Sequence, residues 1–543
     1  MTALIIHGHF YQPPRENPWT GIIDPEPGAQ PFHDWNERIH AECYQPNTAA
    51  RILDETGKEQ LINNYVQISF DVGPTLLSWL ERKHTETYAQ IIAADAESAR
   101  RNNGHGNAVA QAYNHTILPL SNDRDRRTQV RWGLADFRYR FKREAESMWL
   151  PETACNDAVL GLLIDEGLRF VILAPQQAAR VRSSRTGLPA CPHGDRAPTA
   201  KFVPPGEAGT AIPFENNWQS VAEDTIDTSL AYEYFHRDGS GRSLAVFFYD
   251  PQLAQAIAFE QALASSTSLV ERFAQQPRGA GALVNVATDG ESYGHHHKFG
   301  ELCLAYALSI DAPARGLAVS NYGDYLDRHP PEMEVEISNG QYGEGSSWSC
   351  THGVSRWIRD CGCHTGGERG WNQSWREPLR KALDILRDEA AAAFEATREA
   401  LFADPWAARD EAIQLILDQQ KSREEFLHLR APRNLSDEEK QRALLFLELQ
   451  RNTLLMYTSC GWFFSDISGI EPVQILKYAG RAIDLMEQLG LGSPRRQFLE
   501  ALADAESNRS ESGNGADIYR RLVEPCNPSF MGRGEERLAG VLS

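Results

Sequence analysis

Apolar segments of strand length alternate with segments of helical spacing through the first half of the chain. Seven apolar segments each end in polar or functional side chains: Ala3–Phe10, Gln67–Phe70, Ala108–Tyr113, Met148–Leu150, Arg169–Leu173, Leu244–Tyr249 and Ala282–Ala287. Between most of them, apolar residues recur at helical intervals, in Thr75–Arg82, Tyr88–Arg101, Arg127–Glu146 and Asp157–Glu166. This alternation predicts parallel strands joined by right-handed crossovers, and seven such units favour a barrel in the α/β class.

The pattern changes at about Pro330. Beyond Trp375 the chain is almost wholly helical, and one predicted helix face carries Leu379, Leu383, Leu386, Ala390 and Phe394. Ser436 with Glu439 three places later predicts a capping box, and Gly490 is placed as a helix cap. We therefore predict a barrel-type catalytic domain over residues 1–330 and a helical domain over 331–543 that completes the cleft. A Pro-, Gly-, Ser- and Arg-rich loop insertion is expected at about 180–217.

Composition narrows the class of partner. The chain has 543 residues, of which 41% are hydrophobic, and its formal net charge is 54 − 74 = −20. Nucleic acids and anionic membranes both demand clustered Lys and Arg, so neither is expected as a partner. Only Ala3–Ile6 resembles the apolar core of a signal peptide, and no stretch approaches the roughly 20 apolar residues of a membrane span. We expect a cytoplasmic protein; its oligomeric state cannot be deduced.

Two stretches place carboxylates directly after apolar runs. One is Met148–Ala154, which contains Glu152, and the other is Leu283–Glu301, in which Asp289 and Glu291 precede three histidines. The carboxyl ends of barrel strands meet at one face, so we expect Glu152 and Asp289 to face each other across one cleft.

Paired carboxylates suit the cleavage of a glycosidic bond. Retention of configuration needs a nucleophile and a carboxylic acid about 5 to 5.5 Å apart. The apolar wall and rigid proline before Glu152 would fix this side chain as the nucleophile. Like charge from Glu291 would raise the pKa of Asp289, as an acid/base requires. The alternative assigns the acid to Glu291 and makes Asp289 an acceptor for a sugar hydroxyl.

Four short motifs carry a family resemblance. His7–Pro13, Gly106–Asn107 running into Ala112–Leu120, Trp149–Glu152, and Asp289–Glu291 followed by Gly294–His296 resemble motifs of glycoside hydrolase family 57. This resemblance implies a distorted (β/α)7 TIM-like barrel followed by a mainly α-helical domain. It also implies retaining chemistry on α-glycosidic bonds, with Glu152 as nucleophile, Asp289 as acid/base, and His9 and His115 lining the subsite for the reacting sugar.

The fifth motif of that family is poorly matched here. Its nearest candidate is Thr458–Asp466, from which Trp462 and Asp466 could reach over the cleft, and Gly340–Asn372 resembles a poorly characterised branch of the family. The full set of predicted substrate-binding residues is His7, His9, Gln12, Trp19, His115, Trp149, Glu291, His295, Trp348, Trp462 and Asp466.

Two groups of residues in the sequence contain possible metal ligands. His7 and His9 share a strand face and could join Asp289 around zinc, but hydrogen bonding to a sugar and a carboxylate is the preferred role. Cys350, Cys361 and Cys363 are zinc or iron–sulfur ligand types whose spacing fits no common structural zinc pattern. We expect reduced cysteines packed beside tryptophans, no metal and no cofactor.

The sequence thus predicts a retaining α-glycosidase or 4-α-glucanotransferase-type enzyme acting on an α-glucan-like carbohydrate. Hydrolase and transferase share the glycosyl-enzyme, so they cannot be separated at this point. The alternatives are a catalytically inactive carbohydrate-binding or regulatory protein on the same scaffold, and a zinc-dependent carbohydrate-active enzyme. A metal-dependent deacetylase would need an early Asp-Asp pair and a His-x-x-x-His helix, and the sequence has neither.

Overall fold

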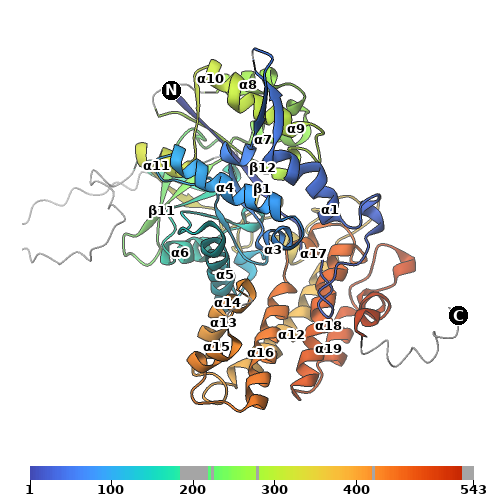
Figure 1. Ribbon diagram of the computed structural model, residues 1–543. Helices are drawn as coiled ribbons and strands as arrows, with labels where there is room; N and C mark the ends of the chain where they lie inside the picture. The colour runs from blue at the N-terminus through green and yellow to red at the C-terminus, as the bar shows by residue number, and fades with distance from the viewer. Residues whose placement is uncertain (55, 184–217, 222–224, 277–280, 419–421, 529–543) are drawn as a thin grey trace, which may run out of the picture.

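The first part of the chain contains seven parallel strands. The computed structural model describes residues 1–543 except 55, 184–217, 222–224, 277–280, 419–421 and 529–543 (Figure 1). The seven strands overlap the seven predicted segments; they are β1 (Thr2–Phe10), β4 (Ser69–Val72), β5 (Ala110–Gln111), β6 (Met148–Trp149), β7 (Phe170–Leu173), β11 (Ser243–Phe248) and β12 (Leu283–Asp289).

Their pairings form a continuous series. Parallel ladders join β12 to β1, β1 to β4, β5 to β6 and β7 to β11. Single parallel bridges join β4 to β5 and β6 to β7. The backbone N–H of Asp250, just after β11, donates to the Asn285 carbonyl in β12. We interpret this series as a distorted seven-stranded barrel, and the α/β class with a helical C-terminal region is confirmed.

Strand β1 is the centre of this arrangement. All nine of its residues are buried, and it pairs with β12 on one edge and with β4 and β13 (Leu317–Val319) on the other. A strand buried on both faces is normally a nearly continuous apolar run, yet β1 carries His7 and His9. Buried polar groups need hydrogen-bond partners, so these two imidazoles must be satisfied inside the protein.

The predicted crossover helices are present. They are α3 (Pro74–Lys83), α4 (Thr85–Arg101), α5 (Asp123–Phe141) and α6 (Asp157–Asp165), and α7 (Pro251–Phe259) follows β11. Side chains at the loop–helix junctions cap the helices: Asn122 and Asn156 accept the N–H groups of Asp125 and Val159, and Asp250 caps α7 in the same way. Asp250 therefore has a capping role at its strand end.

A second sheet extends from the barrel strands. Its order is β7, β11, β10 (Ala231–Phe235), β14 (Met333–Ile337), β8 (Ala178–Ser183) and β9 (Gln219–Ser220). Strands β8 and β9 pair antiparallel, Arg180 with Ser220, at the base of the predicted insertion. Residues 184–217, the bulk of that insertion, lie outside the described residues.

Long helices dominate the C-terminal region, as predicted. They are α12 (Arg376–Glu395), α16 (Asp437–Leu455), α18 (Ile470–Gln488) and the shorter α19 (Arg495–Leu502). All five apolar positions predicted for the face of α12 are buried. The capping box forms at the start of α16, where Glu439 N donates to Ser436 Oγ (3.3 Å) and Ser436 N to Glu439 Oε2 (2.8 Å). Gly490 follows α18 with a φ of 71°.

The barrel and the helical region share a core. Trp132 of α5 packs with residues of α12, α16 and α18, and its indole donates to the carbonyls of Arg409 and Asp410 at 3.0 Å each. Arg409 also pairs with Asp125 at the start of α5 (2.7 Å). Figure 1 shows α13 (Pro405–Glu411) and α14 (Ile413–Leu417) lying next to α5. The two regions therefore form one body around the site.

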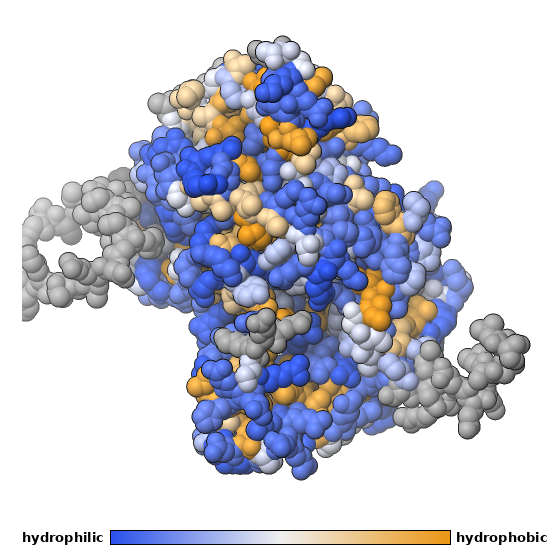
Figure 2. Space-filling view, in the orientation of Figure 1, coloured by the Kyte–Doolittle hydropathy of each residue, from blue (hydrophilic) through white to orange (hydrophobic). Residues whose placement is uncertain are grey.

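The surface is largely polar. In Figure 2 hydrophilic residues cover most of the visible face and apolar residues are scattered among them. None of the helices in the described part of the chain combines the length and apolar character that a membrane span requires.

Candidate active site

Strand register brings three site residues side by side. In the parallel ladders His9 of β1 pairs with Asp289 of β12 on one side and with Asp71 of β4 on the other. All three lie at the carboxyl ends of their strands, where barrel proteins place their chemistry. The predicted convergence of strand ends is thus realised in the backbone before any side-chain contact is considered.

Asp71 holds both histidines of β1. Its carboxylate is fully buried, with Oδ1 3.1 Å from His7 Nε2 and Oδ2 2.9 Å from His9 Nδ1. His7 Nδ1 also lies 3.0 Å from Ser69 Oγ. Burial lowers the pKa of His7, although Asp71 opposes this. For His9, burial also disfavours the charged form, but Asp71 with Asp289 and Glu291 outweighs it and raises the pKa to about 9.

His115 extends this network to the helical region. Its Nε2 lies 3.2 Å from His9 Nε2, and its Nδ1 lies 2.6 Å from Ser459 Oγ. Burial and the nearby His9 lower the pKa of His115 well below its usual value. These shifts favour a neutral His115 whose Nε2 can accept a hydrogen bond from a protonated His9. The chain of contacts orients both imidazoles, and Tyr11 stacks on His115 at 3.8 Å.

Trp149, which precedes Leu150-Pro151-Glu152 in the sequence, packs against the imidazoles of this network. Its ring stacks on His7 at 4.6 Å and on His9 at 5.1 Å, and only 1% of it is exposed. Trp149 therefore helps to hold the two imidazoles in place. Because its ring is buried, it presents no open face to a ligand. The metal alternative at these histidines finds no support, because within the described residues the groups whose ligand atoms converge do not include His7, His9 and Asp289.

Glu152 lies on a strained turn. It belongs to the 3-10 turn Pro151–Thr153, and its φ of 59° and ψ of 24° fall in the left-handed region, as does the φ of 50° at Thr153. Such conformations cost of order 1 kcal/mol or more for non-glycine residues and cluster at functional sites. Gln177 holds the turn, accepting from Thr153 Oγ1 (2.8 Å) and donating to the Thr153 carbonyl (2.8 Å).

Two residues from the segment before the helical region hold the Glu152 carboxylate. Trp348 Nε1 donates to its Oε2 at 2.9 Å and Ser349 Oγ donates to the same oxygen at 2.6 Å. Trp348 N also donates to the Glu152 carbonyl (3.1 Å). One carboxylate oxygen is thereby fixed, and Oε1 is the oxygen left for an incoming atom. Trp348 was a predicted site residue, whereas Ser349 carries no signal in the sequence beyond its position next to it.

Asp289 and Glu291 lie in different environments. Solvent reaches Asp289 at the end of β12, although the surrounding protein still withdraws its carboxylate from bulk water. This desolvation and the charges of Glu152 and Asp71, opposed by His9, raise the pKa of Asp289 to about 6.

Glu291 points inward. It is only 7% exposed, and its Oε1 accepts from Tyr44 OH (2.6 Å) and from the backbone N–H of Tyr11 (3.1 Å). Burial and the charge of Asp289 raise its pKa to about 7, against the opposing bond from Tyr44. Gly290 stands between Asp289 and Glu291 in the sequence. A side chain is excluded at this position, because a Cβ there would lie 2.4 Å from the Phe10 ring. This geometry favours Asp289 over Glu291 as the group that can reach a substrate.

The remaining predicted sugar-binding residues are more dispersed. His295 pairs with Glu42 and contacts Trp35 edge-on at 6.2 Å. Gln12 is buried and accepts from Arg15 (3.0 Å). Trp19 donates to Asp484 of α18 (2.7 Å). Within the described part of the chain, none of these three side chains forms a hydrogen bond with the Glu152 carboxylate or with Asp71.

Trp462 and Asp466 do not reach over the cleft as predicted. Trp462 has no exposed surface; it packs in the helical core beside Tyr457 and Arg380, and its indole donates to the Arg376 carbonyl (3.2 Å). Asp466 accepts from Ser468, Ser507 and Asn508 and so ties together loops of the helical region. The Thr458–Asp466 segment instead brings Ser459 to His115, a contact that no local pattern in the sequence indicates.

Removing the indole donor of Trp348 tests whether Glu152 needs this support. A hydrogen bond to a charged group contributes about 1.5–3 kcal/mol, so Trp348→Phe is expected to lower kcat on an activated glycoside by roughly 10–100-fold. The matched control is Trp406→Phe, which removes an indole donor from a different carboxylate, Glu395. An unchanged kcat in Trp348→Phe would show that the indole does not orient Glu152.

Comparison with known proteins identifies the family of the chain. Two carboxylates and a histidine network at the ends of parallel strands define a candidate glycosidase site, and the model described as Glycosyl hydrolase family 57 matches residues 29–338. This match covers more than half of the chain, which therefore belongs to glycoside hydrolase family 57. A second model, Domain of unknown function (DUF3536), matches residues 371–532. No curated protein sequence gives a significant match.

Solved structures share the fold at low sequence identity. An exo-type maltose-forming amylase from Pyrococcus sp. ST04 has a TM-score of 0.67 and 14% identity over 98% of this chain and 94% of that chain. A branching enzyme from Thermococcus kodakaraensis has a TM-score of 0.50 and 14% identity over 97% and 96%. A 4-α-glucanotransferase from Thermococcus litoralis has a TM-score of 0.50 and 14% identity over 90% of this chain and 60% of that chain.

Proposed function

We propose that this family 57 protein is a retaining enzyme that cleaves or transfers α-linked glucan chains through a glycosyl-enzyme on Glu152, with Asp289 as acid/base. The observation that carries the proposal is the contrast between the two carboxylates. Glu152 is held by two donors on one oxygen, whereas Asp289 is reachable from solvent and has a pKa raised to about 6. A nucleophile and an acid need this difference in environment.

In the proposed mechanism Asp289 starts protonated and donates its proton to the glycosidic oxygen as Glu152 attacks the anomeric carbon. This step releases the aglycone side and leaves the sugar linked to Glu152. The Asp289 carboxylate then takes a proton from water or from a sugar hydroxyl, which attacks the same carbon and regenerates Glu152. The first acceptor gives hydrolysis and the second gives transfer.

The other residues have supporting roles in this proposal. His9 and His115 line the subsite of the reacting sugar; the charge of His9 lies beside Asp289 in the β1–β12 ladder. Residues 1–330 would supply both carboxylates, and residues 331–543 would complete the cleft. The contacts of Trp348 and Ser349 with Glu152, and of Ser459 with His115, support these roles for the two regions of the chain.

The α-glucan substrate class rests on family membership and on the neighbours in fold, which are named as a maltose-forming amylase, a branching enzyme and a 4-α-glucanotransferase. The alternative, an inactive carbohydrate-binding or regulatory protein, is less consistent with a site that retains both carboxylates and fixes one of them by two hydrogen bonds.

Product analysis on linear maltooligosaccharides tests the proposal. We expect the wild-type chain to convert a single purified maltooligosaccharide into shorter chains, or into shorter and longer chains together, as separated by anion-exchange chromatography. Cellooligosaccharides of equal length serve as the linkage control and should remain unchanged. Saturable binding of maltooligosaccharides without any product would instead favour the inactive binding protein.

A further inference from the structure

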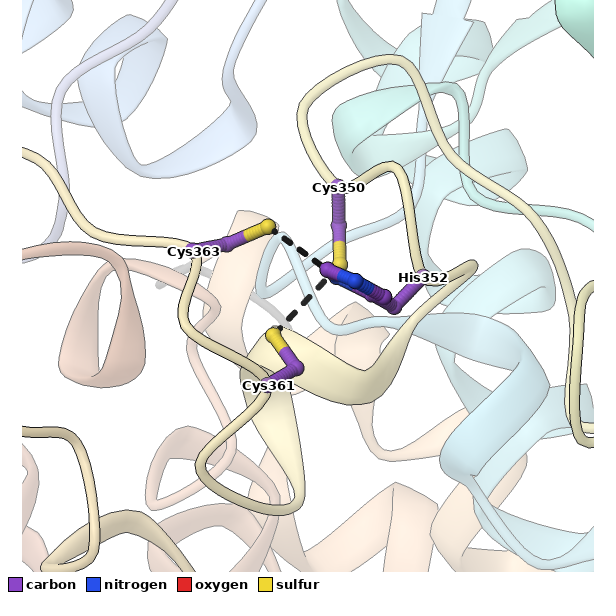
Figure 3. A group of neighbouring side chains, drawn as sticks. All are labelled: Cys350, His352, Cys361 and Cys363. Atoms are coloured by element: carbon purple, nitrogen blue, oxygen red, sulfur yellow. Dashed lines mark hydrogen bonds between the residues drawn. The ribbon is translucent and has the colours of Figure 1, made fainter.

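The loop between β14 and α12 gathers four potential metal ligands. Cys350 and His352 precede the short 3-10 helix Ser355–Trp357 in this loop, Cys361 and Cys363 follow it, and the four side chains point toward one another (Figure 3). Their ligand atoms all lie within 4.8 Å of one another. The sequence places His352 two positions after Cys350, but neither the Cys-x-His nor the Cys-x-Cys spacing shows that these two short stretches meet in space.

The distances match a single tetrahedral ion. Cys350 Sγ and Cys361 Sγ are 3.8 Å apart, and Cys363 Sγ and His352 Nδ1 are 3.4 Å apart. With Zn–S near 2.3 Å and Zn–N near 2.0–2.1 Å, a tetrahedron requires about 3.8 Å between sulfurs and about 3.5 Å between sulfur and nitrogen. A multi-iron cluster distributes its ligands over several irons and would hold them farther apart.

The backbone around the cluster is shaped for this convergence. Gly362, between two of the cysteines, has a φ of 81°, a left-handed conformation that suits glycine.

A buried cation beside the cluster requires negative charge. Arg376 has no exposed surface, and its Nε and Nη2 atoms have no hydrogen-bond partner among the described residues. Its Nη1 donates to the Cys363 carbonyl (2.7 Å), which places the guanidinium against the ligand loop. Three thiolates around a divalent ion carry a net charge of −1, which would offset this guanidinium, whereas four neutral side chains would not.

We propose that Cys350, His352, Cys361 and Cys363 bind one structural zinc ion that closes the loop between β14 and α12. All four positions of the tetrahedron are filled by protein, so the ion has no open site for a substrate. On binding, the three thiols lose their protons to solvent and the imidazole binds as its neutral form. This proposal replaces the sequence-based expectation of reduced cysteines without a metal.

The proposed zinc has a role in the active site. Cys350 directly follows Ser349, which with Trp348 holds the Glu152 carboxylate. A zinc ion that fixes Cys350 therefore also fixes Trp348 and Ser349, which donate hydrogen bonds to Glu152. The effect on catalysis rests on the proposed function of Glu152. Zinc binding itself does not depend on that function, so the two proposals can fail separately.

Metal analysis of the full-length chain, purified without chelator or metal-affinity resin, tests the proposal. We expect stoichiometric zinc in the wild-type chain and in the control Cys526→Ser, which changes a free cysteine elsewhere in the helical region. The pair C361S/C363S should lose zinc, because removing two ligands costs more than the roughly 10–100-fold in affinity that losing an outer-shell partner costs. Chelator should lower the Tm of the wild-type chain but not that of the pair variant.

Several outcomes would overturn the zinc proposal. They are wild-type protein that neither contains zinc nor takes it up when it is added, stoichiometric iron in its place, a Cys350–Cys361 disulfide found by thiol titration under denaturing conditions, or zinc retained by C361S/C363S. The wild-type measurements decide the matter even if the variants fail to fold. Cobalt uptake by the chelated wild-type chain should give the visible bands of a tetrahedral thiolate site and lose them in the pair variant.

Discussion

Replacing Glu152 with glutamine is expected to lower turnover of an activated α-glycoside by at least about 10⁴-fold, because an amide cannot form the covalent glycosyl-enzyme. The side chain keeps its size, and its Oε atom can still accept from Trp348 and Ser349, so the fold and the Tm should change little. Initial rates with an α-glycosyl fluoride, which needs little help from an acid, isolate the role of the nucleophile.

The control for this change is Glu144→Gln, which removes an exposed carboxylate that pairs with the exposed Arg138 and should keep wild-type turnover. Azide supplies the stereochemical test. With Glu152→Ala, azide attacks from the side vacated by the nucleophile and should give the inverted β-glycosyl azide. Unchanged turnover in Glu152→Gln, or no inverted product in the alanine variant of a folded enzyme, would remove Glu152 from the proposed role.

The change Asp289→Asn is expected to lower kcat/KM on glycosides with poor leaving groups by about 10²–10⁴-fold, the usual contribution of general acid catalysis. In the wild-type enzyme the acid must be protonated, so kcat/KM should fall as the pH rises through the Asp289 pKa of about 6. Asparagine does not titrate, and this basic limb of the pH–rate profile should therefore disappear. Glycosyl fluorides should recover much of the first step.

The matched control is Glu291→Gln, two residues along the chain. Its glutamine oxygen can still accept from Tyr44 and Tyr11, and the basic limb should persist in this variant. Azide added to Asp289→Ala should give the α-glycosyl azide with retained configuration, because Glu152 still forms the intermediate. If the basic limb is lost in Glu291→Gln and kept in Asp289→Asn, the acid is Glu291 and the rival assignment holds.

Local sequence pattern was a reliable guide to elements. The seven apolar segments overlap the seven parallel strands, and Ser436 with Glu439 forms the predicted capping box. The apolar face of α12 is buried at every predicted position. These features depend on hydrophobic period and on contacts within a few residues, which a single sequence displays directly.

Partners far apart in the chain were not recognisable in this way. Asp71 lies near the carboxyl end of β4, but only the β1–β4 register shows that it holds both His7 and His9. Ser459 meets His115 across 344 positions in the sequence. Trp462 is predicted from the sequence to reach over the cleft and is instead fully buried, because helical packing encloses it.

The sequence by itself determined where most strands and helices form and which residues stand at strand ends, and the family resemblance made Glu152, Asp289 and the histidines the candidates for the chemistry. The tertiary structure decided how they differ: it exposes Asp289, anchors Glu291 on Tyr44, fixes Glu152 with Trp348 and Ser349, and gathers Cys350, His352, Cys361 and Cys363. The physical reason is that burial and long-range hydrogen bonding, which set the environment of a titratable group, arise only when distant segments pack together.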